Sequence, residues 1–508
     1  MALATVRSVA VHGIEGQLIE VEAFISSGVP AFHVVGLPDA TVNESRDRVR
    51  AAIVNAREPW PQMKITVGLS PAGVRKAGSG FDLAIAAAVL LAHDRVPPDF
   101  LRGAAVLGEL SLDGRVRPIA GVLPSVLAAV RNGIERVLVP AATAAEARLV
   151  PGAEVIGIAT LPQLIALMRG EDDLEPAPVD LSDLVDEPAG PDLSQVVGQH
   201  EGRRAVEIAA AGGHHLLLVG SPGCGKPMLA ERLPGLLPPL STQDALEVSA
   251  IHSVAGVLPP GRPLLRRPPF RAPHHTASTA ALVGGGSALI RPGAASLAHR
   301  GVLFLDEAAE FPSGTLDALR QPLESGQIVI DRAAARASYP ARFTLVLASN
   351  PCPCARTAGA GDDACECTRT VRRRYLGKLS GPLLDRVDLQ VRLLPVSRAD
   401  LLDGTVRGEP SAAVADRVAA ARTRAGARLQ GTPWSSWGEV PGTWVRQQWH
   451  PPFASMGPLN HEADRGRISA RGTDRVLRVA WTLADLEGTD SPEERHVKEA
   501  VALRQGLA

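Results

Sequence analysis

One glycine-rich stretch of the sequence has the residues and the spacing to bind the phosphates of a nucleotide. Residues 220–228 read GSPGCGKPM and satisfy the pattern Gly-x-x-x-x-Gly-Lys-[Ser/Thr] at every position except the last, where Pro227 stands. In such a loop the backbone N–H groups and the start of the next helix point at phosphate oxygens, and the lysine, Lys226, reaches the β- and γ-phosphates. The expected nucleotide-binding residues are Gly220, Ser221, Pro222, Gly223, Cys224, Gly225, Lys226, Pro227 and Met228.

Three further polar residues follow apolar runs and could complete an ATPase site. GVLFLDE (301–307) ends in Asp306 and Glu307, and RFTLVLASN (342–350) ends in Asn350. Asp306 would hold Mg²⁺ directly or through water, and Glu307 would orient the attacking water as general base. Asn350 suits a polar sensor between the γ-phosphate and that water. Taken alone, the carboxylates are typical of a solvated turn and SNPCP of turn chemistry, so the prediction depends on the loop that precedes them.

The elements that must position these residues are strands of a parallel sheet. HHLLLVG (214–220) is a short apolar run that leads directly into the glycine loop, and 301–307 and 342–350 are similar runs. Helical segments separate the three, which is the βαβ pattern of a parallel sheet. The order strand–Lys, strand–Asp-Glu, strand–Asn predicts an additional-strand P-loop ATPase core.

Pro227 raises a question about activity. Proline removes the hydroxyl that normally binds Mg²⁺ and one backbone N–H that normally faces the phosphates, but it fits the first turn of a helix, so folding should survive. Losing one donor and one metal ligand costs ~2–5 kcal/mol of binding or transition-state stabilisation. Because the rest of the site is intact, the chain is either a slow ATPase or the bearer of a recent substitution.

Four of the five cysteines form a second candidate site. Cys352-x-Cys354 and Cys365-x-Cys367 are separated by ten residues, ARTAGAGDDA. Four thiolates could close a tetrahedral, structural zinc site with no open position for catalysis. The spacing is C-x-C rather than the usual C-x₂₋₄-C, so reduced thiols in a turn are an equally good interpretation.

Bulk composition limits the class of protein but not its ligand. The chain has 508 residues, 45% of them apolar and 21% charged, which predicts two to four globular domains. Basic and acidic residues nearly cancel, at 53 against 54, so any nucleic-acid surface must be local. No apolar run reaches the ~18–20 residues that span a bilayer, and the cysteine usage also fits a cytoplasmic protein.

The chain divides by composition into four parts. Residues 1–170 alternate apolar runs with Gly/Pro punctuation and read as a compact α/β or α+β domain, with a buried helix at 81–94. Residues 171–192 are acidic and Pro-rich, which is typical of a linker. The ATPase core occupies 193–400, and 401–508 are mostly helical, for example at 411–429 and 474–488. We therefore expect a multidomain α/β protein.

Long stretches of the sequence make the resemblance more specific. FRAPHHTASTAALVGGG (270–286), RPGAASLAHRGVLFLDE, RQPLESGQIVIDRA, PARFTLVLASNPCPC and LSGPLLDRVDL resemble the magnesium-chelatase-like AAA+ proteins of the YifB/ComM type, and the likeness covers nearly the whole chain. It implies that Arg386 is an arginine finger inserted into a neighbouring subunit, which requires a ring, expected to be a homohexamer. It also implies that 401–508 form a helical lid carrying a second sensor, Arg471, with Arg475 as an alternative. From the residues alone, these arginines would be surface charges or ion pairs.

The same resemblance implies two insertions that face a central pore, at 253–286 and in a hairpin at 326–341. Local positive charge in a neutral protein suits contact with DNA phosphates, although such loops could equally be subunit contacts. The candidate residues are Arg262, Arg266, Arg267, Phe270, Arg271, His274, His275, Arg332 and Arg336.

The N-terminal region resembles the C-terminal domain of Lon proteases, especially at LGELSLDGRVRPIAGVLPSVLAA (107–129). A Lon-type protease uses a Ser–Lys dyad. Alignment of KAGSGFD places the nucleophile position on Gly80 and the lysine position near Leu123, and neither can do the chemistry. Ser79 is adjacent but has no lysine at the partner position. We expect a degenerate, non-proteolytic domain used for assembly or DNA binding.

These features favour a hexameric ATPase that uses ATP and Mg²⁺, and structural Zn²⁺ if the thiols bind metal, to move DNA. The resemblance implies a branch-migration helicase or translocase in recombination or natural transformation. One alternative is a nucleotide-dependent DNA-binding ring that hydrolyses little, because of Pro227. Another is a chelatase-type motor that moves a partner protein, against which the Lon-like domain counts. DNA-stimulated hydrolysis, DNA binding without turnover, and stimulation by protein alone distinguish the three.

Overall fold

A computed structural model describes residues 2–171, 190–259, 261–286, 290–332, 335–356, 365–396 and 408–506. Most of the linker predicted at 171–192 therefore lies outside the described residues, as do the boundary predicted near residue 400 and part of the loop between the cysteine pairs. None of the helices in the described ranges is both long and apolar enough to cross a membrane.

The N-terminal region is built on a mixed sheet with the strand order β3-β4-β2-β1-β5-β8-β9. Its first two strands form a long antiparallel hairpin, and β5, β8 and β9 run parallel to β1. Helix α3 (Asp82–Ala92) is buried along almost its whole length, as its unbroken apolar sequence predicts. The strands are β1 Ala2–His12, β2 Glu15–Ser26, β3 Ala31–Val35, β4 Lys64–Ser70, β5 Ala104–Val106, β8 Arg136–Pro140 and β9 Glu154–Ile158, and the other longer helices are α2 Ser45–Asn55, α4 Val122–Arg131 and α6 Leu161–Arg169.

The central region contains a five-stranded, all-parallel sheet with the order β11-β12-β15-β10-β16. The three strands predicted from the apolar runs are present, which confirms the parallel-sheet core. Its strands are β10 Leu216–Gly220, β11 Phe270–Arg271, β12 Val302–Leu305, β15 Thr344–Ser349 and β16 Leu389–Leu393. Helices around it include α7 His200–Gly212, α8 Lys226–Arg232, α9 Thr242–Ala255, α13 Arg320–Ser325 and α14 Arg369–Leu376. The hairpin expected at 326–341 is β13 Gln327–Arg332 paired with β14 Ala335–Pro340.

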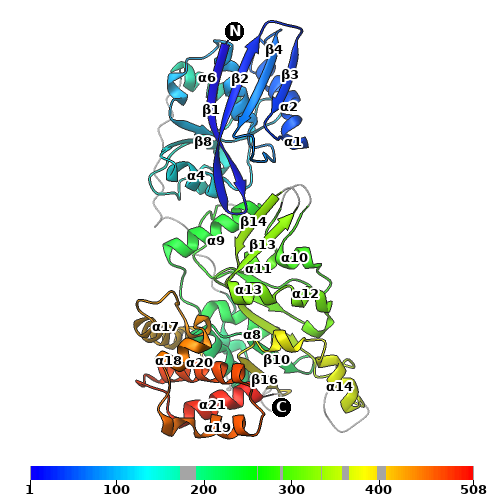
Figure 1. Ribbon diagram of the computed structural model, residues 1–508, viewed down its shortest axis with the longest axis vertical. Coiled ribbons are helices and arrows are strands. Elements are labelled where there is room, and N and C mark those ends of the chain that lie inside the picture. The colour runs from blue at the N-terminus through cyan, green and yellow to red at the C-terminus, as the bar shows by residue number, and fades with distance from the viewer. Residues whose placement is uncertain are drawn as a thin grey trace.

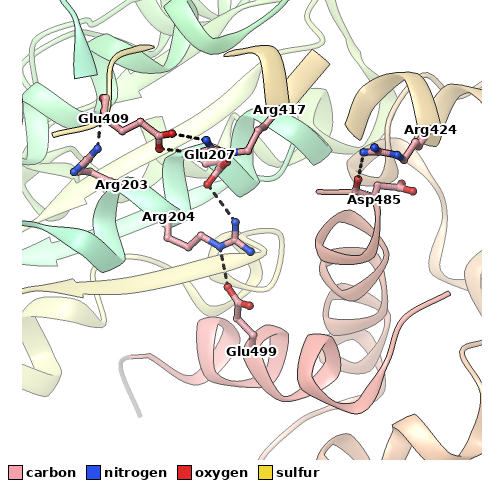
Figure 2. A network of polar contacts seen from close by, with 8 residues as sticks. All are labelled: Arg203, Arg204, Glu207, Glu409, Arg417, Arg424, Asp485 and Glu499. Atoms are coloured by element: carbon pink, nitrogen blue, oxygen red, sulfur yellow. Dashed lines mark hydrogen bonds and ion pairs between the residues drawn. The ribbon is translucent and has the colours of Figure 1, made fainter. Parts of the chain in front are cut away.

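The C-terminal region is helical and packs on α7. It consists of α17 Ser411–Arg428, α18 Gly442–Gln448, α19 Gly457–Asp464, α20 Ala470–Glu487 and α21 Glu494–Gln505. Trp437 is fully buried and stacks on Trp481 with ring centroids 5.2 Å apart. Figure 2 shows the polar contacts that join this region to α7. Arg204 reaches Glu499 of α21 at 3.1 Å, and Glu207 accepts from Arg417 of α17 at 2.7 Å.

The N-terminal region lies against α9 of the central region, and the tip of its β1–β2 hairpin meets β14 (Figure 1). Apolar residues of α4 and α9 share one core cluster. At its edge the half-buried Glu146 accepts from the backbone N of Leu123 at 2.9 Å and from the hydroxyl of Ser253 on α9. A Cβ on Gly13, at the hairpin tip, would lie 2.5 Å from the carbonyl oxygen of Ser338, so the two regions touch too closely there for any other residue.

Candidate active site

The glycine loop lies between the end of β10 and the start of α8. Gly223 and Gly225 have φ values of +78° and +86°, a conformation that favours glycine, and a Cβ on either would meet nothing within 4 Å. The loop therefore presents its backbone to open space. Pro227 occupies the first turn of α8, as expected of a proline that the helix tolerates.

Lys226 and Asn350 meet at this loop. The Lys226 ammonium is buried and donates to the carbonyl oxygens of Gly220 at 2.7 Å and Ser221 at 3.1 Å, and to Asn350 Oδ1 at 3.1 Å. Burial lowers the pKa of Lys226, while the nearby charges of Asp306 and Glu307 act to raise it. The lysine, the amide and the two carboxylates thus belong to one electrostatic site, and they follow the three strands in the order predicted from the sequence.

Asp306 and Glu307 follow β12 at the same edge of the sheet. Glu307 has φ +49°, in the left-handed region, and its backbone N donates to Asp306 Oδ1 at 2.9 Å. The Glu307 carboxylate pairs with His275, Nδ1 to Oε2 at 3.0 Å. The left-handed conformation of a non-glycine residue is strained, and such strain is often found at functional sites.

These residues fit a nucleotide with Mg²⁺. The open face of the loop, the helix start behind it and Lys226 would hold phosphates, and Asp306 is the carboxylate available to the metal ion. The Ser221 hydroxyl is buried and has no hydrogen-bond partner in the part of the chain that the structure describes, so a polar atom at the loop is left for a ligand to satisfy.

Arg386 and Arg471 lie at the opposite end of the strands, where β10 and β16 begin. Arg386 precedes β16, whose first residue, Leu389, pairs with Leu216 at the start of β10, whereas Lys226 follows the end of β10. At ~3.3 Å per residue the two ends of β10 are roughly 13 Å apart. The structure therefore does not bring Arg386 to the glycine loop of its own chain.

Arg386 and Arg471 are both held by ion pairs. Arg386 donates to the Pro382 carbonyl oxygen at 2.6 Å and to the Glu324 carboxylate, and it is largely buried. Arg471 pairs with Asp385 at 3.1 Å and is 77% exposed, so it lies beside the Arg386 segment and not beside Lys226. A cavity of about 820 Å³ opens beside Arg386; its charged lining residues are Asp317, Arg320, Glu324, Asp331, Arg332 and Arg386.

Asp388 anchors that end of the strands to the C-terminal helices. It is buried, accepts from the backbone N of His215 at 3.1 Å and pairs with Arg475 at 3.0 Å. Burial alone would raise its pKa, but Arg475 and His214 hold the pKa of Asp388 well below its usual range. Arg475 therefore has a structural partner, which leaves Arg471 as the more accessible of the two sensor candidates.

The basic residues of the two insertions differ in exposure. Arg271 is half-buried, and burial lowers its pKa, while Phe270 packs on Phe304 with centroids 6.0 Å apart. Arg262 is also half-buried. Arg336 pairs with Asp331 at 3.4 Å in an exposed position. The exposed members are Arg266, Arg267, His274, Arg332 and Arg336.

The N-terminal region has no Ser–Lys pair at the aligned positions. Leu123 is fully buried in an apolar cluster, and Gly80 carries no side chain. The Ser79 hydroxyl donates to the Glu109 carboxylate. Lys76, three residues earlier, is fully buried and donates to the Pro71 carbonyl oxygen, and burial lowers its pKa.

The four cysteines predicted as a zinc site come together. Their Sγ atoms all lie within 4.8 Å of one another, and Cys352 Sγ is 3.2 Å from both Cys354 Sγ and Cys365 Sγ. A tetrahedral zinc ion with Zn–S bonds of ~2.3 Å needs S···S distances of ~3.8 Å, so the cluster fits that ion. A hydrogen bond from Cys352 is the main cause that lowers the pKa of Cys365 to about 6, which favours a thiolate.

Sequence reasoning missed two contacts. His275 was identified only as a basic residue of an insertion, and its contact with Glu307 was not foreseen. Glu324, the partner of Arg386, carried no signal, because it lies 62 residues from its partner on a helix of ordinary composition. A histidine pair that follows the edge strand β11 after two residues was the one sequence feature that could have indicated the first contact.

Comparison with known proteins matches almost every part of the chain. Family descriptions match at residues 192–401 (magnesium chelatase, subunit ChlI), 21–143 (subunit ChlI of Mg-chelatase) and 408–504 (subunit ChlI, C-terminal). An uncharacterized protein of Mycobacterium tuberculosis is 54% identical over 99% of both chains. YifB of Escherichia coli is 42% identical, and competence protein ComM of Haemophilus influenzae is 39% identical, each over 99% of this chain and 97% or 98% of its own.

A partial similarity to Lon proteases is also found. Lon protease 2 of Bacillus subtilis is 32% identical over 96 residues, which is 19% of this chain and 17% of that protein. The likeness is consistent with the Lon-like fold expected for the N-terminal region, and it extends to only a small part of either protein.

Proposed function

Because the chain belongs to the magnesium-chelatase-like AAA+ family that includes YifB and ComM, we propose that it is an ATP-hydrolysing ring that moves DNA. ATPase activity follows from the family. The finer proposal is a branch-migration helicase or translocase that acts in recombination or in the uptake of DNA during transformation, as the name of the competence protein ComM suggests.

One observation carries the proposal. The carboxyl ends of the parallel strands bring together Lys226, Asn350, Asp306 and Glu307. Arg386 lies at the amino ends of the strands. ATP with Mg²⁺ supplies the phosphoryl group and its counter-charge. Lys226 and the loop N–H groups bind the phosphates, and Asp306 holds the metal ion. Glu307 takes a proton from the attacking water, and Asn350 orients that water.

Arg386 completes the site from a neighbouring copy. It lies roughly 13 Å or more from the glycine loop of its own chain along β10, so it serves a nucleotide only across a subunit boundary. A closed ring gives every copy one such neighbour, and six copies are the proposed number. Arg471, beside the same segment, is proposed to sense the nucleotide from the C-terminal helices.

The DNA contacts of the proposal are the exposed basic residues of the two insertions, and the N-terminal region is a non-proteolytic domain for assembly or DNA binding. Structural Zn²⁺ would be held by Cys352, Cys354, Cys365 and Cys367.

Pro227 supports a second candidate, a nucleotide-dependent DNA-binding ring with little hydrolysis, because the Mg²⁺-binding hydroxyl is missing. A motor acting on a partner protein is the third, since the matching family descriptions are those of a magnesium chelatase subunit. The DNA-moving ring is favoured over both alternatives by the contact between His275 and Glu307, which joins a basic insertion to the proposed general base.

The proposal is tested by following a labelled four-way DNA junction as it is converted to duplex products. We expect conversion by the chain to require ATP and Mg²⁺. Glu307→Gln should bind the junction but slow conversion by about 10²–10⁴-fold, because it lacks the general base. Conversion that proceeds equally in the Glu307→Gln variant, or DNA binding that never leads to conversion, would overturn the translocase.

A further inference from the structure

Helix α14 presents an unassigned basic surface. The helix extends from Arg369 to Leu376 and projects from the edge of the central region, away from both the N-terminal region and the C-terminal helices (Figure 1). Its four arginines, Arg369, Arg372, Arg373 and Arg374, are all exposed, and Tyr375 is its one buried residue.

Three of these arginines have no acidic partner among the residues that the structure describes. Arg372 donates to the backbone oxygen of Cys365 at 3.5 Å, but no carboxylate there pairs with Arg369, Arg373 or Arg374. Many other arginines of the chain are paired, as in the Arg204–Glu499 and Arg417–Glu207 pairs of Figure 2. In a chain of net charge −1, α14 is therefore a local excess of positive charge.

The helix is held at both ends. Thr368, next to Cys367 of the thiol cluster, caps its first turn by accepting from the backbone N of Val371. At the other end Tyr375 is buried, and Lys378 lies over its ring at 5.3 Å while pairing with Glu310 at 3.4 Å. A helix backbone fixed in this way does not have to be ordered when its side chains bind a ligand.

The residue composition of α14 indicates which of two kinds of negatively charged macromolecule, a protein or a nucleic acid, it suits. A protein partner needs an apolar interface core, and Val371, 40% exposed, is the one large apolar side chain that α14 offers. Interfaces with nucleic acid are more polar and far more positive. The planar guanidinium also matches the geometry of phosphate oxygens.

We propose that Arg369, Arg373 and Arg374 form a binding site for the phosphate backbone of nucleic acid, separate from the insertions at 253–286 and 326–341. The inference rests on the proposed action on DNA and adds a second place where DNA is held. It also gives the thiol cluster a purpose, which is to fix the helix that carries the site.

The test is the salt dependence of junction binding by the full chain, measured by fluorescence anisotropy with a labelled four-way junction. Each duplex phosphate contact contributes ~0.9 to the slope of log K against log salt. We expect R369A/R373A/R374A to reduce that slope by about 2–3 and to weaken binding at least about tenfold near 0.1 M salt. The lysine triple R369K/R373K/R374K should retain most of the slope, since it keeps the charge.

R50A/R57A/R131A is the matched control, because it removes three exposed arginines of the N-terminal region that also have no acidic partner within the described ranges. An equal loss in this control, or an unchanged slope in the α14 triple while the parent chain binds, would overturn the site and leave the proposed function standing. A change in assembly mass instead of DNA affinity would make α14 a subunit contact. If the parent chain binds no DNA, both proposals fail. Should the triple not fold, Arg373→Ala alone must lower the slope by about 0.9.

Discussion

His275 Nδ1 lies 3.0 Å from Glu307 Oε2, and this contact joins a basic insertion to the proposed general base. The two side chains come from segments that follow neighbouring strands, β11 and β12, at the same edge of the sheet. While the contact holds, one carboxylate oxygen is engaged by the histidine and not by a water molecule. We expect DNA bound to the insertion to move His275 and so to change how the Glu307 carboxylate engages water.

We expect His275→Ala to raise ATP hydrolysis in the absence of DNA and to bring the DNA stimulation ratio close to one, with DNA affinity little changed. The matched control is His274→Ala. The ring of His274 lies 4.1 Å from that of His275, but His274 is exposed and hydrogen-bonds to Thr276, so its removal should leave the stimulation ratio near that of the parent. Equal effects of the two substitutions would show that the Glu307 contact has no part in coupling.

Subunit mixing tests whether the site is shared between copies. Lys226→Ala and Arg386→Ala should each lower turnover by about 10³-fold or more, because one loses the phosphate lysine and the other the arginine finger. Mixed rings should regain part of the activity, since some boundaries then pair an intact loop with an intact Arg386. If Arg386 acted within its own chain, mixing would restore nothing.

The polar ends of the three strands could be predicted because each lies next to its strand in the sequence. Asp306, Glu307 and Asn350 follow apolar runs directly, Lys226 follows one through the glycine loop, and parallel strands bring their carboxyl ends together. The partners of Arg386 and Glu307 could not be predicted, since Glu324 and His275 reach them only through tertiary packing. Sequence spacing carries no record of such contacts.

The fold shows the same division. Helix α3 and strands β10, β12 and β15 could be read from unbroken apolar runs. The close approach of Gly13 to Ser338 and the contact of Glu146 with Ser253 depend on how two regions pack, and neither residue stands in a pattern that indicates it.

Zinc should be present at one ion per chain, as measured by elemental analysis of the purified protein. Cys352→Ser should remove it, because one of four thiolates is lost, and should lower the melting temperature by several degrees. Cys224→Ser is the control, since Cys224 lies in the glycine loop away from the cluster, and it should keep the metal. A parent chain without zinc, or a Cys352→Ser variant that retains it, would contradict the structural site.

Glu146 should make stability depend on pH. Burial raises its pKa above the ordinary value, although hydrogen bonds from Ser253 and Leu123 oppose the shift. A carboxyl with a raised pKa binds its proton more readily in the folded state, so its contribution is complete below the ordinary pKa and is lost as pH rises through the folded pKa.

The melting temperature of the parent should therefore fall as pH rises across that range, and Glu146→Gln should remove this fall. Glu146→Ala should cost about 1–3 kcal/mol below the ordinary carboxyl pKa, because it leaves the backbone N of Leu123 and the hydroxyl of Ser253 without their acceptor, and that cost should shrink as pH rises through the folded pKa. Glu135→Gln, at an exposed position of the same region, is the control and should follow the parent. Identical pH profiles for the parent and Glu146→Gln would refute this account.

The central claim, an ATPase driven by DNA, is tested most directly by Mg²⁺-dependent ATP hydrolysis with and without a four-way junction, on the chain and on Pro227→Thr. We predict that the junction accelerates both and that the threonine variant is at least about tenfold faster, because it regains a metal ligand and a backbone donor. Turnover by the threonine variant alone would make the natural chain a DNA-binding ring. Hydrolysis that ignores DNA in both would contradict the account and direct the search to a protein partner.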